Sequence, residues 1–146
     1  MATLKRRIEQ ALTALIGAIP GPTVKFDAEL PSECPVSGFV RIGPLDFGDP
    51  VDVILGQPNQ NEYEAMVEID LLAQKGAKTA RAATLDDLVL ALGAKLKTDP
   101  TLGGLVDLMQ PSAPQSHSDE AVVGSDAVSG QVVTLTLSFV TSDPLA

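Results

Sequence analysis

The segment Asn61-Glu62-Tyr63-Glu64-Ala65-Met66-Val67-Glu68-Ile69-Asp70-Leu71-Leu72 decides the fold class of this chain. Its odd-numbered positions from 63 onward are apolar: Tyr63, Ala65, Val67, Ile69 and Leu71. Its even-numbered positions are mostly acidic: Glu62, Glu64, Met66, Glu68 and Asp70. This period of two residues predicts an antiparallel strand that buries one face and exposes the other to water.

A second segment near the C-terminal end has the same period. Val133, Leu135, Leu137 and Phe139 alternate with hydroxyl-bearing residues. Threonine and β-branched residues suit a pleated, half-solvated surface, so residues 131–141 are expected to form another strand. Shorter strands are predicted at residues 24–26, 39–42, 51–55 and 120–123, with a turn into a short strand over residues 102–109.

Two helices complete the predicted elements. Leu4, Ile8, Leu12 and Leu15 or Ile16 recur at helical spacing, which predicts an amphipathic helix over residues 2–19, with Glu9 among its polar positions. The second helix is expected to start at Thr84 as N-cap, with Asp87 completing a capping box, and to end before Asp99-Pro100.

The order of these elements is helix, strands, helix, strands. This order predicts one α+β domain over residues 1–146, with a mainly antiparallel sheet flanked by two helices and long Pro/Gly-rich loops or arms. A chain of 146 residues has the length of one domain. Residues 23–60 are rich in proline and glycine, and we interpret them as an extended loop or arm.

Charge is distributed unevenly along the chain. Residues 26–70 contain ten acidic residues and the single base Arg41, so this window carries −9, equal to the net charge of the whole chain. Bases gather at residues 5–7 and around the second helix. Such a surface repels a phosphate backbone, which disfavours autonomous binding of DNA or RNA, and no sequence-specific nucleic-acid partner is expected. The simpler interpretation is a solubilising acidic surface, and the alternative is a bipolar subunit whose basic patch meets the acidic patch of a neighbour.

The bipolar interpretation selects a set of candidate subunit-interface residues. They are Lys5, Arg6, Arg7, Glu64, Glu68, Asp70, Lys78 and Arg81.

Composition excludes several classes of protein. No apolar run approaches the roughly 18 residues of a membrane span, and polar residues interrupt the segment after Lys5-Arg6-Arg7, so neither a membrane protein nor a secreted one is expected. Cys34 is the single cysteine, which excludes an internal disulfide and a cysteine-based zinc site.

No catalytic, cofactor-binding or metal-binding site is predicted. His117 is the single histidine and is interpreted as a solvated loop residue. The segment Gly124–Gly130 lacks the spacing of a nucleophile elbow and fits a hairpin. Carboxylates on the wet face of residues 62–70 lie about 7 Å apart at successive positions, too far to hold one small ion unaided. We therefore expect no enzyme.

Two segments carry a resemblance to a known family. The first is Asp99-Pro100-Thr101-Leu102-Gly103-Gly104-Leu105-Val106-Asp107, which follows the second helix, and the second is the final strand with its end, residues 132–145. Both resemble the tail terminator (minor tail U-like) proteins of long-tailed phages, prophages and gene transfer agents. Residues 23–60 match nothing in that family that we can place.

The resemblance implies a structural role in a virion. Tail terminators form a ring, expected to be hexameric, that caps the head-proximal end of the tail tube, stops its polymerisation and offers the surface that joins the head. The implied partners are further copies of the chain, the tail tube protein and a head-side connector or adaptor, with DNA free to pass through the ring channel. The implied location is the head–tail junction, after assembly in the host cytoplasm.

Two other interpretations stay open. A head–tail connector or tail completion protein has the same size and ring habit. A small soluble enzyme or ligand-binding domain belongs to a different class and would need a pocket with converging polar groups, for example around His117 and Asp119.

Overall fold

The structure is a computed structural model that describes residues 1–29, 31, 34–74, 76–116, 122–123 and 126–146. His117, Asp119, Gly124 and Ser125 therefore lie outside the described residues. The elements follow one another in the order α1 (Leu4–Gly17), β1 (Thr23–Phe26), β2 (Phe39–Ile42), β3 (Asp52–Ile54), β4 (Gln60–Ala73), α2 (Lys78–Thr98), β5 (Leu108–Pro111), β6 (Gln115–Ser116), β7 (Val122–Val123), β8 (Asp126–Ala127) and β9 (Ser129–Thr141).

The main sheet has seven strands, with the central order β1-β2-β4-β9-β5. The long strands β4 and β9 pair antiparallel over their whole shared length, with Val67 opposite Leu135. Only β1 and β2 pair in parallel among the strand pairs described, so the sheet is mixed but mostly antiparallel. The α+β class predicted from the sequence is confirmed. β7 and β8 form a separate two-stranded antiparallel pair.

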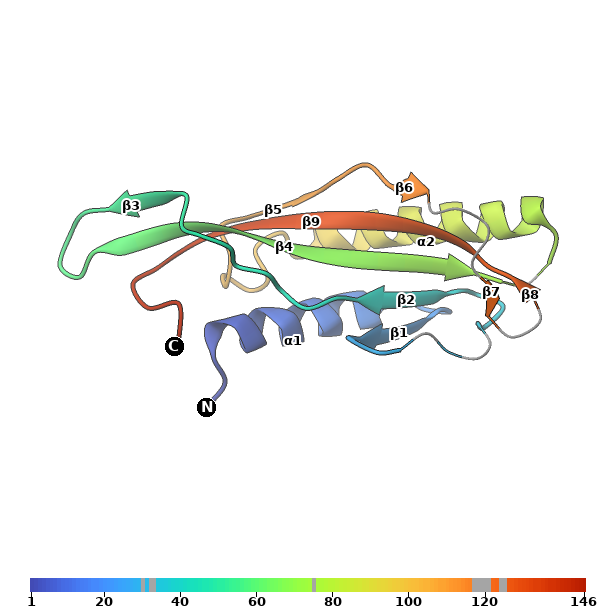
Figure 1. Cartoon of the computed structure of the whole chain (residues 1–146), viewed down its shortest axis with the longest axis horizontal. Helices are drawn as coiled ribbons and strands as arrows, with labels where there is room; N and C mark the ends of the chain where they lie inside the picture. Colours follow the sequence, from blue (N-terminus) through green and yellow to red (C-terminus); the bar gives the residue numbers. More distant parts are fainter. Residues whose placement is uncertain (30, 32–33, 75, 117–121, 124–125) are drawn as a thin grey trace.

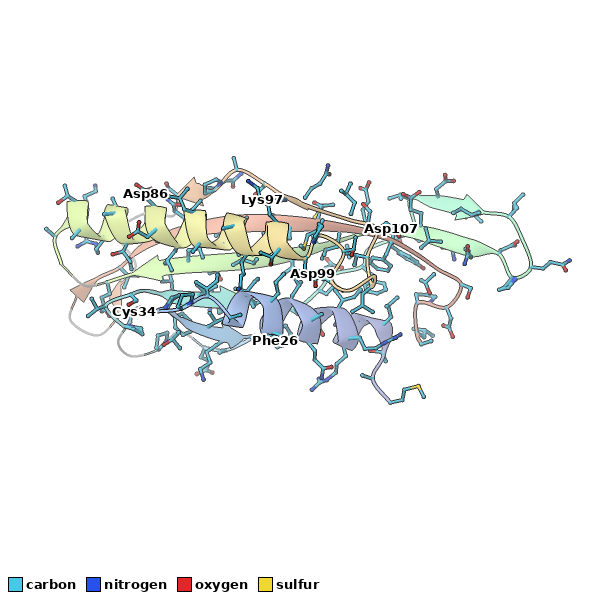
Figure 2. The ribbon with its side chains drawn as sticks, turned by 180° about the vertical axis from the view of Figure 1, so that it is seen from behind. Phe26, Cys34, Asp86, Lys97, Asp99 and Asp107 are labelled. Carbon is cyan, nitrogen blue, oxygen red and sulfur yellow. The ribbon has the colours of Figure 1, made fainter. Side chains whose placement is uncertain are left out.

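Both helices cover the same face of the sheet (Figures 1 and 2). The odd-numbered apolar positions of β4 and β9 face the helices and are buried with them in one core. The other face of β4 carries exposed Glu64, Met66 and Glu68. The face assignment predicted from the two-residue period is therefore confirmed for both long strands.

Helix α2 starts seven residues earlier than predicted. It begins at Lys78 after the N-cap residue Ala77, which makes no side-chain capping bond. Thr84 lies inside the helix, where its Oγ1 donates to the carbonyl oxygen of Ala80 at 3.1 Å. The capping-box prediction is wrong because Lys78–Ala83 consists mostly of strong helix formers, which extend the helix past the local capping signal. The leucines Leu85, Leu88, Leu92 and Leu96 are buried as expected.

Helix α1 follows its prediction closely, with one exception. Thr3 caps it by accepting a hydrogen bond from the Arg6 amide, and Ile8, Leu12 and Ile16 are buried. Glu9, predicted on the polar side, is instead 8% exposed. Its carboxylate has a partner far away in the sequence, described below.

Candidate functional site

A hairpin formed by β3 and the start of β4 projects from one end of the molecule (Figure 1). We call residues 51–62 the hairpin. Asp52 pairs with Glu62 and Ile54 with Gln60 across it. All residues from 51 to 60 are exposed, so none of the described residues covers this segment.

Apolar side chains are concentrated on the hairpin. Val51, Val53, Ile54 and Leu55 are 54%, 52%, 44% and 82% exposed, respectively. The sequence predicted a strand over residues 51–55 but gave no sign of this exposure, because the alternation with Asp52 is also typical of a half-buried strand. A monomeric protein rarely exposes contiguous large apolar side chains, and such patches mark interaction sites. The hairpin is therefore the first candidate for a functional surface.

Three aromatic rings hold the base of the hairpin. The ring of Phe47 packs edge-on against Phe139 with centroids 4.9 Å apart, and it lies 5.5 Å from the ring of Tyr63. Tyr63 and Phe139 face each other across β4 and β9 at 5.9 Å. Aromatic pairs in this distance range stabilise packing beyond the area they bury. The hairpin thus emerges from a well-packed base.

The segment that leads into the hairpin is also fastened to the core. The backbone N–H of Leu45 donates to Glu9 Oε2 at 2.9 Å, and that of Gly43 donates to the carbonyl oxygen of Glu68 at 2.8 Å. Asp46 and Met66 exchange two backbone hydrogen bonds of 2.9 Å. Residues 43–47 therefore belong to the packed body, and the projecting hairpin begins after them.

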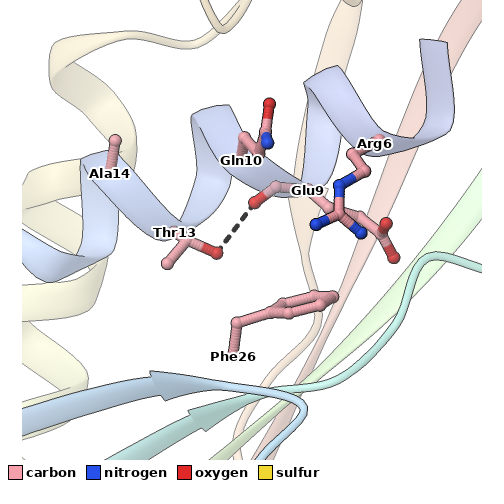
Figure 3. A pocket seen from close by; sticks show the side chains of 6 residues that line it. All are labelled: Arg6, Glu9, Gln10, Thr13, Ala14 and Phe26. Carbon is pink, nitrogen blue, oxygen red and sulfur yellow. Dashed lines mark hydrogen bonds between the residues drawn. The ribbon is translucent and has the colours of Figure 1, made fainter. Parts of the chain in front are cut away.

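A second surface feature is a groove between α1 and β1 (Figure 3). The helix supplies Arg6, Glu9, Gln10, Thr13 and Ala14, and the ring of Phe26 lies below the helix on the side of Thr13. Arg6 and Glu9 lie toward one end of the groove and Ala14 lies at the other (Figure 3). The groove has a volume of about 340 Å³, and most of the surface it offers is apolar. We call it the α1–β1 groove.

The basic candidates fall into two groups that the fold keeps apart. Lys5, Arg6 and Arg7 are exposed on the first turns of α1. Lys78 is exposed at the start of α2, and α2 starts at the opposite end of the molecule from α1 (Figure 1). Arg81 is half-buried and ties α2 to neighbouring segments, since it donates from Nη1 to the Gly76 carbonyl at 3.0 Å and from Nε to Ser129 Oγ at 2.9 Å.

The acidic candidates share the face of the sheet that the helices leave open. Glu64 and Glu68 are exposed there. Asp70 is half-buried, and its Oδ2 accepts from Arg41 Nε and Nη2 at 2.9 and 2.7 Å. Part of the negative charge of Asp70 is therefore compensated within the chain, whereas Glu64 and Glu68 stay available on the surface.

The described part of the chain offers no metal centre, since no three histidine, cysteine, aspartate or glutamate side chains gather there in a way that could hold an ion. Neither helix combines the length and apolar character needed to cross a bilayer, within the residues that the structure places. Cys34 is buried, with its N–H donating to Gln74 Oε1 at 2.7 Å.

Comparison with known proteins gives a distant structural likeness. No protein-family model and no curated protein matches the chain. Among solved structures, the chain is similar to a chain of one described as "Virion of native gene transfer agent (GTA) particle", with 15% sequence identity and a TM-score of 0.37, covering 93% of this chain and 92% of that chain. A likeness of this size establishes no function for the chain.

Proposed function

We propose that the chain is a structural protein of a virion, and that within the virion it terminates the phage tail. In this role, copies of the chain form a ring, expected to be hexameric, on the head-proximal end of the tail tube. The ring stops polymerisation of the tube and presents the surface that joins the head. The partners are then further copies, the tail tube protein and a head-side connector or adaptor, met at the head–tail junction after assembly in the host cytoplasm.

The observation that carries this proposal is the exposed apolar hairpin. Leaving four large apolar side chains in water forgoes the favourable free energy of burying them, about 25 cal/mol for each Å² of apolar surface. A subunit that acts only after assembly recovers this free energy at its interface. The hairpin therefore supports an assembly protein over a free-standing domain.

The resemblance of residues 99–107 and 132–145 to tail terminators supports the particular assembly. In this fold both segments belong to the frame of the molecule: Leu102 and Val106 are buried after α2, and Val133, Leu135, Leu137 and Phe139 line the core from β9. The resemblance thus concerns the scaffold and leaves open which surface meets which partner.

A non-enzymatic role is part of the proposal. Ser129 Oγ accepts a hydrogen bond from a guanidinium, which stays protonated and cannot remove the hydroxyl proton of a nucleophile. Cys34 is fully buried, out of reach of a substrate. Both groups are engaged in the packing of the chain, which supports a structural role for these two side chains.

Electron microscopy of particles made without this protein tests the proposal. We expect tails of uncontrolled length, because nothing stops the growth of the tube. Tails of normal length that lack heads would overturn termination in favour of the connector or tail completion role. Normal infectious particles would overturn the virion role altogether, as would turnover of a substrate by the purified protein.

A further inference from the structure

We propose that the hairpin of one copy docks in the α1–β1 groove of the next copy. The two surfaces lie on different parts of the same chain: the hairpin projects from one end, while the groove opens between α1 and β1 beside the body of the sheet (Figures 1 and 3). The inference rests on the proposed assembly of copies and names the contact that links them.

The apolar character of the two surfaces is complementary. The hairpin offers Val53, Ile54 and Leu55 as exposed aliphatic side chains. The groove offers the ring of Phe26, the methyl group of Ala14 and the aliphatic stems of its polar residues. Its volume of about 340 Å³ lies within the range of sites that enclose a small molecule, which leaves room for more than one aliphatic side chain.

The charges of the two surfaces are also complementary. The hairpin, residues 51–62, contains Asp52 and Glu62 and no lysine or arginine, and Asp49 and Glu64 lie just outside it. Arg6 and Glu9 line one end of the groove, and Lys5 and Arg7 are exposed on the same first turns of α1. Among the described residues, an ion pair joins Arg41 to Asp70 and does not involve Arg6. The side chain of Arg6 is exposed. An incoming acidic hairpin therefore meets a basic helix end, which favours this partner over a second groove or a second hairpin.

The geometry of this contact has a consequence for assembly. A hairpin and a groove are different surfaces, so each copy uses its hairpin on one neighbour and its groove on the other. A head-to-tail contact of this kind, repeated, closes into a ring or continues as a filament. The contact accordingly supplies the type of interface that a ring needs, whereas an isologous contact would end at a dimer.

Cross-linking between engineered cysteines tests the contact. Leu55→Cys places a thiol on the hairpin and Ala14→Cys places one in the groove, and both positions are exposed. The two single variants of the full chain are mixed and treated with a short thiol-specific bifunctional cross-linker, which tolerates a wider range of distances than a disulfide does. We expect a covalent dimer in the mixture, and a ladder of larger products from the double variant.

The matched control replaces the groove thiol with Lys97→Cys. Lys97 projects from the side of α2 away from α1 and Phe26 (Figure 2). Native Cys34 stays in all variants because it is buried. Cross-linking of Leu55→Cys to Lys97→Cys that equals its cross-linking to Ala14→Cys would overturn the proposal.

Mass photometry of the same samples separates this inference from the proposed function. Oligomers without preferential cross-linking would overturn the hairpin contact and leave ring formation standing through another surface. A protein that stays monomeric at every concentration would overturn the contact itself. Infectious particles with normal tails, made without the protein, would instead overturn the proposed function.

A measurement of self-association provides a second, independent readout. Leu55→Ser removes one apolar side chain that is 82% exposed, so we expect little change in the stability of the fold. We expect the association constant to fall about tenfold, the size of effect expected when one buried aliphatic side chain is lost from an interface. Leu90→Ser on α2, which removes a leucine that is 72% exposed, is the matched control and should leave association unchanged. An equal effect of both substitutions would contradict the contact.

Discussion

The carboxylate of Glu9 on α1 accepts a hydrogen bond of 2.9 Å from the backbone N–H of Leu45, 36 positions further along the chain. This bond fixes the segment between β2 and β3 against the helix. Leu45 is itself buried, so its N–H has no access to water and needs an acceptor from the protein. The position from which the hairpin projects therefore depends in part on one acidic side chain of α1, together with the backbone bonds of Gly43 and Asp46.

Removing this acceptor should destabilise the protein. Glu9→Ala leaves the buried Leu45 N–H without its partner, and we expect the free energy of unfolding to fall by about 1–3 kcal/mol. Glu9→Gln keeps an acceptor oxygen at the same position and should cost less. Urea denaturation of the three proteins checks the order, and equal stability of Glu9→Ala and the original chain would contradict a structural role for the bond.

The two faces of β9 should respond differently to a charge. Leu135 is fully buried among core residues, so Leu135→Asp places an ionised carboxylate where water cannot reach it, and we expect loss of cooperative unfolding. Thr136→Asp, one position along, lies on the face away from the helices and opposite Met66. Its cost should stay within about 1 kcal/mol. Circular dichroism during heating distinguishes the two, and a folded Leu135→Asp protein would reverse the face assignment.

Two glycines should respond in opposite directions to replacement by alanine. Gly38 has φ +97°, and a Cβ there would lie 2.7 Å from Leu88 Cδ1 and 3.1 Å from the Leu72 carbonyl oxygen. Gly38→Ala should therefore cost about 1–3 kcal/mol of unfolding free energy through backbone strain. Gly93 lies inside α2 with open space where its Cβ would be, so Gly93→Ala should stabilise the protein by about 0.5–1 kcal/mol. Thermal unfolding midpoints that move in the same direction would contradict this account.

The elements that sequence reasoning predicted well are those whose signal is local and repeated. Alternation over residues 61–72 and 131–141 predicted both long strands and the face that each buries, because a period of two residues is a property of the strand itself. Helix α1 was predicted in a similar way, because its apolar residues recur at the three- and four-residue spacing of a helix. The start of α2 was misplaced because a capping signal at Thr84 competes with the helix propensity of Lys78–Ala83, and the sequence alone does not say which prevails.

The candidate site was harder to predict because it depends on contacts between distant segments. Glu9 is a charged residue of the kind usually found on the surface. It is buried because its carboxylate accepts a hydrogen bond from the backbone N–H of Leu45. Whether Val53 and Leu55 are buried depends on whether another element covers β3. The pattern of residues 51–55 alone does not predict this. The α1–β1 groove likewise arises where Phe26 meets a helix face from another part of the chain. The basic and acidic candidates were found from charge counts, but their separation on the surface, and the tie of Arg81 to Ser129, follow from topology.

Reversing charge on α1 should weaken assembly and leave the fold intact. Arg6 and Arg7 are exposed, and acidic residues are favourable at a helix N-terminus, so Arg6→Glu with Arg7→Glu should change the free energy of unfolding by less than about 1 kcal/mol. The same change places two negative charges where we expect the acidic hairpin of a neighbour, so the yield of oligomers should fall sharply. For the same electrostatic reason, the original chain should assemble more weakly as salt is raised.

Lys97→Glu, on the side of α2 away from α1 (Figure 2), is the matched control and should assemble normally. Light scattering across a salt series, together with thermal unfolding, measures both effects; a collapse of thermal stability with assembly preserved would show that these arginines support the helix and take no part in joining copies.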